Sequence, residues 1–126
     1  MPGNGKVAFS ATDPSGRKVI AYQSTLDSHR MKHQEPFTDE DIVSCIESPT
    51  MIAKSGHVEK GHESRYVYYK DGAFEDGGPT TMKTVVEHSK QPGVLTSAFR
   101  TSKRSADGAI VYIDNNMKKG IGKWSQ

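Results

Sequence analysis

The sequence predicts an α+β fold in which one or two N-terminal helices pack on a four- or five-stranded antiparallel sheet, with an extra N-terminal β-hairpin. The aliphatic composition favours strands, because nine valines and seven isoleucines accompany only two leucines. β-Branched side chains suit a pleated strand, whereas leucine is a preferred helix former. One segment has a clear helical pattern, and several short apolar runs are separated by turn residues. The composition excludes a helical bundle, and the length of 126 residues favours a single domain over residues 1–126.

The first 24 residues are expected to form the hairpin extension. Two short apolar runs, 6–10 and 17–22, flank the tetrad Asp-Pro-Ser-Gly at 13–16. Aspartate at the first position, proline at the second and glycine at the fourth are typical of a type I turn. The two runs are therefore predicted to be antiparallel strands that precede a core spanning residues 25–113.

A helix is predicted to begin after Thr38. The threonine hydroxyl can cap the first turn, and the acidic residues at 39–41 suit the positive end of the helix dipole. Apolar residues at 42, 43 and 46 form one stripe, and Pro49 ends the helix. The polar segment from 24 to 36 does not distinguish helix from loop.

Strand patterns account for most of the remaining chain. A short strand is expected at 51–53, and later strands are expected at 65–70, 82–87, 94–100 and 109–113. Asp-Gly at 71–72 and Gln-Pro-Gly at 91–93 are turn signals. Strands joined by short turns predict an antiparallel meander, with the helix covering one of its faces.

The distribution of charged and apolar residues limits the classes of partner. The net charge of +2 divides into −2 over residues 1–63 and +4 over residues 64–126. A basic C-terminal third that ends in a basic tail at 114–126 suits a phosphate backbone. No apolar run is long enough for a membrane helix, so no membrane partner is expected. The single cysteine, Cys45, lies among apolar residues and is expected to be buried.

Four of the five histidines lie between positions 29 and 62. His29 and His33 are four residues apart, so they would share one face of a helix. The chain lacks a His-Glu-x-x-His motif and offers no third ligand at a recognised spacing, which argues against a metal site. We therefore expect neither a metal nor a cofactor.

General acid–base chemistry is the alternative use of these histidines, because imidazole titrates near neutral pH. Cleavage of RNA needs a base for the 2′-hydroxyl, an acid for the leaving 5′-oxygen, and cations or hydroxyls around the phosphate. Several predicted strands carry such groups. The candidate catalytic residues are His29, His33, Arg65, Thr96 and Ser97, and the candidate substrate-binding residues are Lys83, Arg100, Thr101, Lys103 and Arg104.

The order of these segments resembles the barnase–EndoU–colicin–RelE-like ribonuclease superfamily, particularly its phage-borne and polymorphic-toxin branches. A histidine segment at 29–33 leads into a helix, and strands at 65–70, 82–86 and 94–99 follow, the last reading Val-Leu-Thr-Ser-Ala-Phe. Many members of the superfamily have a Thr-x-Ala-Phe strand near the end. The resemblance covers about residues 25–113 and leaves the N-terminal hairpin aside.

The resemblance implies a metal-independent endoribonuclease, often directed against transfer RNA. His29 or His33 would match the histidine of the family, Thr96 its strand threonine, and Arg65 and Lys83 its phosphate-stabilising positions. It also implies a cognate immunity protein or antitoxin. The site of action would be the cytoplasm, reached directly or after delivery as part of a larger toxin.

A non-catalytic binding or inhibitor module is the alternative. It would dock on a protein or nucleic acid through basic residues such as Lys103, Arg104 and Lys118, and it needs no histidine.

Overall fold

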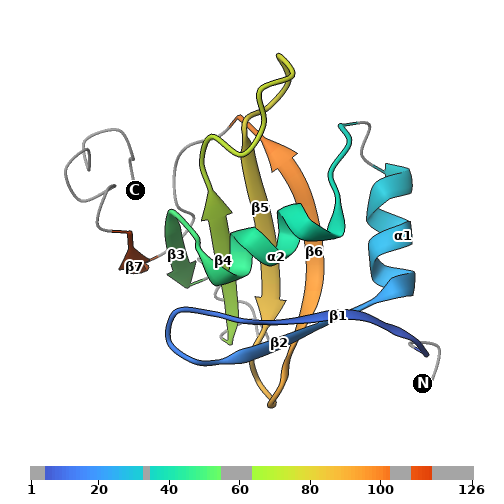
Figure 1. Ribbon diagram of the computed structural model, residues 1–126. Coiled ribbons are helices and arrows are strands. Elements are labelled where there is room, and N and C mark those ends of the chain that lie inside the picture. The colour runs from blue at the N-terminus through green and yellow to red at the C-terminus, as the bar shows by residue number, and fades with distance from the viewer. Residues whose placement is uncertain (1–4, 33–34, 55–63, 103–108, 115–126) are drawn as a thin grey trace.

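The computed structural model describes residues 5–32, 35–54, 64–102 and 109–114, which form two helices and seven strands (Figure 1). The α+β class is therefore confirmed. The elements along the chain are β1 (Val7–Thr12), β2 (Lys18–Tyr22), α1 (Gln23–Lys32), α2 (Asp39–Glu47), β3 (Met51–Lys54), β4 (Arg65–Lys70), β5 (Thr81–Glu87), β6 (Gly93–Thr101) and β7 (Ile110–Ile113).

The described strands form one mixed sheet in the order β1-β2-β6-β5-β4-β3-β7. The predicted four- or five-stranded antiparallel sheet is thus wrong in size and in one pairing. The difference arises at the hairpin, because β2 pairs in parallel with β6 through Val19↔Gly93 and Ile20↔Val94. Ala11, Val19 and Ala21 of the hairpin are buried in the main core, so the hairpin is an integral part of the sheet.

The hairpin turn has the predicted form. The Gly16 amide donates to the Asp13 carbonyl, and the Asp13 amide donates to the Arg17 carbonyl, each at 2.9 Å. The Asp13 side chain closes the turn further, since Oδ1 accepts from the Ser15 amide, the Ser15 hydroxyl and the Arg17 amide. Gly16 has a φ of 91°, a conformation that favours glycine.

Helix α2 begins as the sequence predicts. Thr38 is its N-cap: the hydroxyl accepts from the Asp41 amide, and the Asp41 carboxylate accepts from the Thr38 amide. The helix buries Ile42, Cys45 and Ile46 against the sheet. The Cys45 thiol donates to the Tyr68 carbonyl, and burial raises the pKa of the thiol to about 12, so it has little thiolate character at neutral pH.

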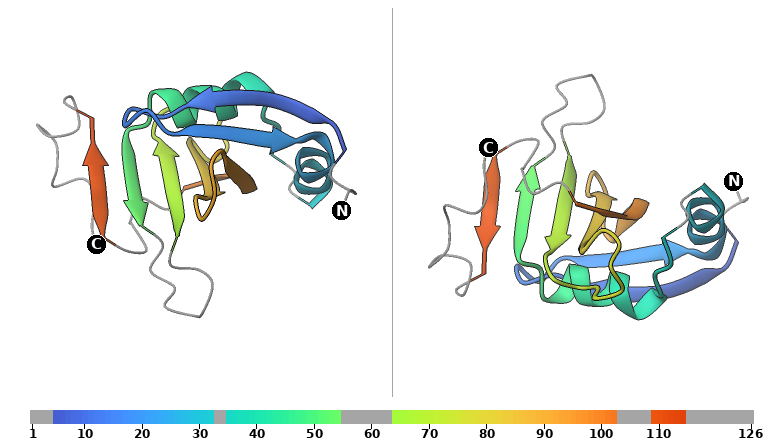
Figure 2. Two further views of the ribbon diagram at one scale, coloured as in Figure 1. Left: turned by 90° about the horizontal axis from the view of Figure 1, so that it is seen from below. Right: turned by 90° about the horizontal axis from the view of Figure 1, so that it is seen from above.

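Helix α1 occupies the segment that the sequence left open. It is polar and buries a single residue, Leu26. Helix α1 contacts β6 and β2 at one side of the sheet. The hairpin end of the sheet curls over, so that the hairpin and α2 lie on the same side of the central strands (Figure 2). We call the face on that side, which carries Tyr68, Met82 and Val86, the helix face.

The opposite face of the sheet is here called the back face. Alternation along each strand places its side chains opposite the core residues of the helix face. The register aligns three neighbouring strands there, with Val67 of β4 next to Val85 of β5 and Val85 next to Ser97 of β6. The back face of these strands consists of Arg65, Val67, Tyr69, Lys83, Val85, Glu87, Ser97, Phe99 and Thr101.

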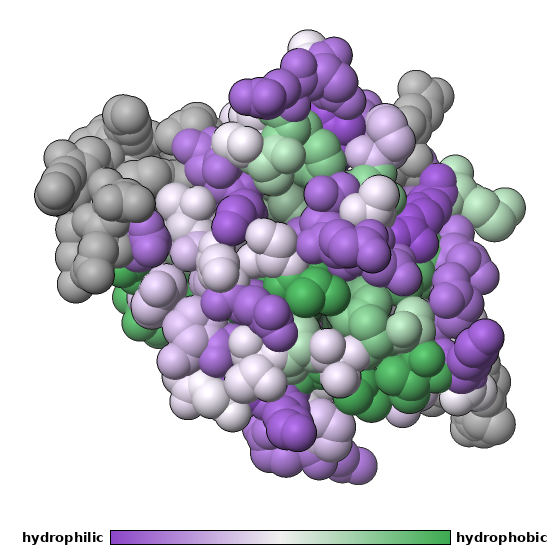
Figure 3. Space-filling model, in the orientation of Figure 1, coloured by the Kyte–Doolittle hydropathy of each residue, from purple (hydrophilic) through white to green (hydrophobic). Residues whose placement is uncertain are grey.

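The helix face carries an acidic groove of about 470 Å³ between α2 and β1. Its floor is apolar, from Phe9 and Val43, and its walls hold Asp39, Glu40 and Glu47. Figure 3 shows this side of the molecule, with hydrophilic residues along α2 and apolar ones around the hairpin. Asp39 is paired with Arg30, and the carboxylates of Glu40 and Glu47 disfavour a polyanion in this groove.

Candidate back-face site

Several residues predicted to act on a substrate lie together on the back face. Arg65, Lys83, Ser97 and Thr101 come from three neighbouring strands, and each side chain is half-buried. Antiparallel pairing fixes their spacing, because Lys83 lies opposite Phe99 and Thr81 lies opposite Thr101. A sheet is a rigid support, so this arrangement holds cationic and hydroxyl groups at defined positions.

Lys83 lies near the middle of the back face. Its Nζ is 5.7 Å from the ring centroid of Tyr69 and 5.4 Å from that of Phe99. The two rings belong to the strands on either side of β5, so aromatic groups flank the ammonium across the sheet. Cation–π attraction on both sides stabilises the charged lysine between the two rings.

Glu87 joins Arg65 at the end of the same face, and sequence reasoning missed it. Arg65 Nε donates to Glu87 Oε1 at 3.1 Å, while the Ser64 hydroxyl and the Ser89 amide donate to Oε2. Burial raises the pKa of Glu87, but the hydrogen bonds from Ser64, Arg65 and Ser89 outweigh it, so the net pKa is lowered. The carboxylate is therefore ionised at neutral pH. The pairing of β4 with β5, which places Arg65 opposite Glu87, becomes visible only in the structure.

The structure brings two predicted catalytic residues, His29 and Thr96, into contact. His29 Nε2 lies 3.0 Å from the carbonyl oxygen of Thr96. Strand β2 pairs with β6 only at Gly93 and Val94. Beyond these residues, the edge of β6 is contacted by α1. Since a carbonyl only accepts, Nε2 carries the proton, and His29 holds α1 to the sheet.

Thr96 itself is an extra residue in the ladder between β5 and β6. Val85 lies opposite Ser97 and Val86 lies opposite Leu95, so Thr96 forms a β-bulge. Its hydroxyl donates to the Val85 carbonyl at 3.2 Å. The bulge shifts the alternation of β6, which lets Leu95 and Ala98 both enter the main core.

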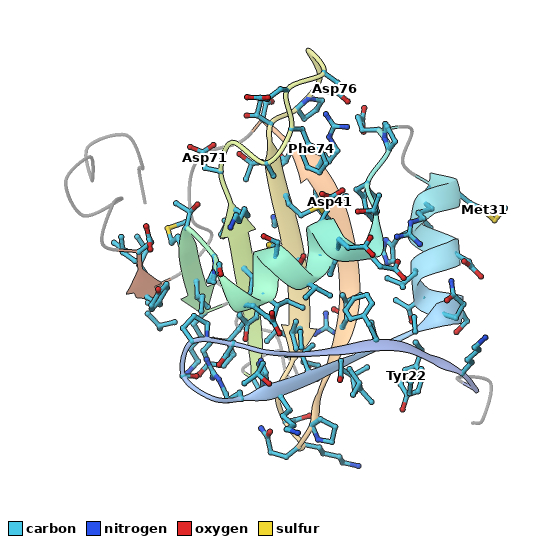
Figure 4. The ribbon with its side chains drawn as sticks, in the orientation of Figure 1. Tyr22, Met31, Asp41, Asp71, Phe74 and Asp76 are labelled. Atoms are coloured by element: carbon cyan, nitrogen blue, oxygen red, sulfur yellow. The ribbon has the colours of Figure 1, made fainter. Side chains whose placement is uncertain are left out.

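Arg100, a predicted substrate-binding residue, lies on the helix face, so the structure does not bring it together with Lys83. Its side chain is 1% exposed and is ion-paired with Asp76 at 2.5 Å. The guanidinium also donates to the carbonyls of Pro36 and Pro79 and packs 3.9 Å from the Phe74 ring centroid (Figure 4). These contacts occupy the group in anchoring the loop between β4 and β5, and hydrogen bonding to Arg100 lowers the pKa of Asp76 to about 2.

Three further candidates fall outside the described part of the chain. They are His33, Lys103 and Arg104. Lys118, which the alternative binding role invokes, also lies outside the described residues. The roles expected for these residues stay predictions.

A second polar cluster lies on the helix face and was also missed. The Tyr68 hydroxyl donates to Asp13 Oδ2 at 2.6 Å and lies 2.9 Å from His88 Nε2. Arg17 Nε completes it with a 3.0 Å contact to Asp13 Oδ2. Asp13 was visible in the sequence only as a turn residue, because its buried partners are far away along the chain.

Comparisons of the chain with protein-family models, with curated proteins and with solved structures found no match. The resemblance to the barnase–EndoU–colicin–RelE-like superfamily therefore stays a prediction. Among the described residues, no cluster of three or more histidine, cysteine, aspartate or glutamate side chains could hold a metal ion. No helix in this part of the chain is long and apolar enough to cross a membrane.

Proposed function

We propose that the chain is a metal-independent endoribonuclease that binds RNA on the back face. The observation that carries this proposal is the placement of Arg65, Lys83 and Ser97 on one face of three neighbouring strands, with the Glu87 carboxylate beside Arg65. Cations and hydroxyls on a rigid sheet suit a phosphate group. The acidic groove between α2 and β1 supports the same choice, because its carboxylates disfavour RNA at that part of the helix face.

The reaction needs only proton transfer and charge stabilisation. A base removes the proton from a ribose 2′-hydroxyl, and the 2′-oxygen then attacks the adjacent phosphorus. The bond to the 5′-oxygen breaks, and an acid gives a proton to that oxygen. The products are a 2′,3′-cyclic phosphate and a 5′-hydroxyl end.

We assign the base to Glu87, because its carboxylate is ionised and lies beside the cation Arg65. Arg65 stabilises the charge that develops on the non-bridging oxygens, while Lys83, Ser97 and Thr101 hold the neighbouring RNA backbone on the same face. His29 is the acid in this assignment, and it must release the Thr96 carbonyl to reach the leaving oxygen.

The experiment is incubation of the purified protein with total RNA in the presence of a chelator. We expect cleavage by the wild type and a loss of about 100-fold or more in Glu87→Gln, the size typical of a general base. Lys83→Gln should lose activity as well. Lys18→Gln is the matched control, because Lys18 is an exposed lysine on β2, outside the back face. Intact RNA with the wild type would contradict the proposal.

Binding without cleavage is the second candidate function. It is favoured by one observation: the groups that would move protons are already engaged, His29 with a backbone carbonyl and Glu87 with Arg65. Fluorescence anisotropy with a labelled RNA separates the two functions. A non-catalytic module would bind the RNA through Lys83 and leave it intact.

An inhibitor is part of the proposed function. A ribonuclease acting in the cytoplasm requires protection of the cell that makes it, and we propose an acidic immunity protein or antitoxin that covers Lys83 and Arg65. Expression in a bacterial host tests the need for this partner: the wild type should slow growth when it is expressed alone, and Glu87→Gln should be harmless.

A further inference from the structure

A pocket of about 510 Å³ lies on the other side of the sheet from the back-face site. It is formed where the hairpin turn meets β3, β4 and β7. Tyr66 lines it, and Tyr66 follows Arg65 in β4, so the two side chains point to opposite faces. The volume is within the range of small-molecule sites in proteins.

The walls of this pocket combine aromatic, aliphatic and cationic groups. Tyr66 and Tyr112 supply two rings, and Ile52 and Val111 supply aliphatic surface. Val111 is 50% exposed and places apolar surface at the rim of the pocket. Among the described lining residues Arg17 carries the only full charge, and its guanidinium carbon lies 4.3 Å from the Tyr66 ring centroid.

Arg17 is held in place by the second polar cluster. Its Nε donates to Asp13 Oδ2, which uses one of the five N–H donors of the guanidinium. Asp13 is itself buried and accepts from the Ser15 hydroxyl and from Tyr68, so its negative charge is spread over several donors. A cation fixed in this way loses little conformational entropy when a ligand binds.

We propose that this pocket binds a single nucleotide, with the base against Tyr112 and the phosphate on the remaining N–H groups of Arg17, whose guanidinium is held over the Tyr66 ring. Aromatic rings accept any base by stacking, and arginine is a common phosphate-binding group. The nucleotide can come from solution or from an unpaired position of an RNA. The site needs neither Lys83 nor Glu87, so it stands independently of the proposed cleavage.

The test is titration of the full chain with adenosine monophosphate, followed by calorimetry or by chemical shifts of the tyrosine rings. Adenosine and inorganic phosphate, each alone, should bind at least about tenfold more weakly, since each lacks one of the two contacts. A hexameric RNA separates the sources: binding of the mononucleotide but not the hexamer indicates a free nucleotide, and binding of both indicates RNA.

Three variants make the assignment specific. Arg17→Gln and Tyr112→Ser should each weaken binding at least about tenfold. Val111→Asp should do the same by placing a negative charge at an exposed rim position, where it leaves the core intact. Arg30→Gln is the matched control, because Arg30 is also ion-paired with an aspartate and lies near an aromatic ring.

Lys83→Gln should bind the nucleotide like the wild type, which separates this site from the back face. Equal binding of phosphate and adenosine monophosphate, or full binding by both Tyr112→Ser and Val111→Asp, would overturn the proposal. So would the absence of binding at millimolar nucleotide.

Discussion

The Tyr68 hydroxyl donates a 2.6 Å hydrogen bond to the Asp13 carboxylate, and the two residues are 55 positions apart in the chain. Tyr68 is fully buried in the middle of the sheet, and Asp13 begins the turn of the N-terminal hairpin. The bond therefore ties the hairpin to the central strands. Burial together with the bond to Asp13 raises the pKa of Tyr68, so the hydroxyl keeps its proton and remains a donor.

Replacing Tyr68 by phenylalanine should destabilise the whole domain. The change removes one donor from a buried carboxylate, which costs about 1–3 kcal/mol in the free energy of unfolding. Urea unfolding followed by circular dichroism measures it. Tyr22→Phe is the control, because Tyr22 lies at the end of β2 and is only partly buried (Figure 4); equal losses in the two variants would contradict the role of the bond.

The free energy of unfolding should decrease as the pH is lowered, because His88 takes up a proton. Burial lowers the pKa of His88 below its usual 6.5, and nearby Arg17 lowers it further, against the opposing charges of Asp13 and Glu87. A group with a lowered folded-state pKa contributes stability that is present above 6.5 and is lost as the pH falls through the folded-state pKa. The slope for one proton is at most about 1.4 kcal/mol per pH unit.

The measurement is the free energy of unfolding at pH 7 and at pH 5 for the wild type and for His88→Gln. The loss between the two values should be smaller in the variant. Asp13 acts in the same direction but at lower pH, because its hydrogen bonds outweigh burial and hold its pKa below 3.8. If both proteins lost the same free energy of unfolding between pH 7 and pH 5, groups other than His88 would be responsible for the loss.

The ring of His88 also explains the glycine at position 93. A Cβ at Gly93 would lie 2.4 Å from His88 Nδ1 and 3.1 Å from Val86 Cγ1. Gly93→Ala should therefore force the imidazole away from Tyr68, at a cost of about 1–3 kcal/mol. In the background of His88→Ala the same change should cost less, and a double-mutant cycle measures this coupling. Additive effects would show that the imidazole does not restrict this position.

The cap of α2 gives a local test. Thr38→Ala should lower the free energy of unfolding by about 1 kcal/mol, because the Asp41 amide loses its acceptor. Thr80→Ala is the control, since Thr80 is exposed in the loop before β5. Thermal unfolding compares the two, and unchanged stability of Thr38→Ala would contradict the capping role.

Local patterns predicted much of the fold. The turn at 13–16, the start of α2 at Thr38 and the positions of β3 to β7 follow from short-range signals that the structure confirms. Helix α1 could not be predicted because its sequence is polar and its position depends on contacts of Leu26 and His29 with distant strands. The parallel pair of β2 and β6 is likewise a long-range contact with no local signal.

Strand alternation predicted part of the candidate site, whereas the long-range contacts of the site could not be predicted. Alternation along β4 to β6 is enough to place Arg65, Lys83 and Thr101 on one face, and it places Arg100 on the other. The partner of Arg100, Asp76, lies in a loop whose position no periodicity gives. Glu87 was missed because its role depends on the register between two strands, which the sequence does not specify.

The most direct test of the proposed function uses a DNA oligonucleotide that contains one ribonucleotide, with a chelator present. The wild type should cut after the ribonucleotide and leave a 2′,3′-cyclic phosphate, and a 2′-O-methyl version should stay intact because the attacking hydroxyl is blocked. Glu87→Gln should cut at least about 100-fold more slowly. Cleavage of the 2′-O-methyl oligonucleotide, or equal rates for Glu87→Gln and the wild type, would contradict the assignment of the back face as a ribonuclease site.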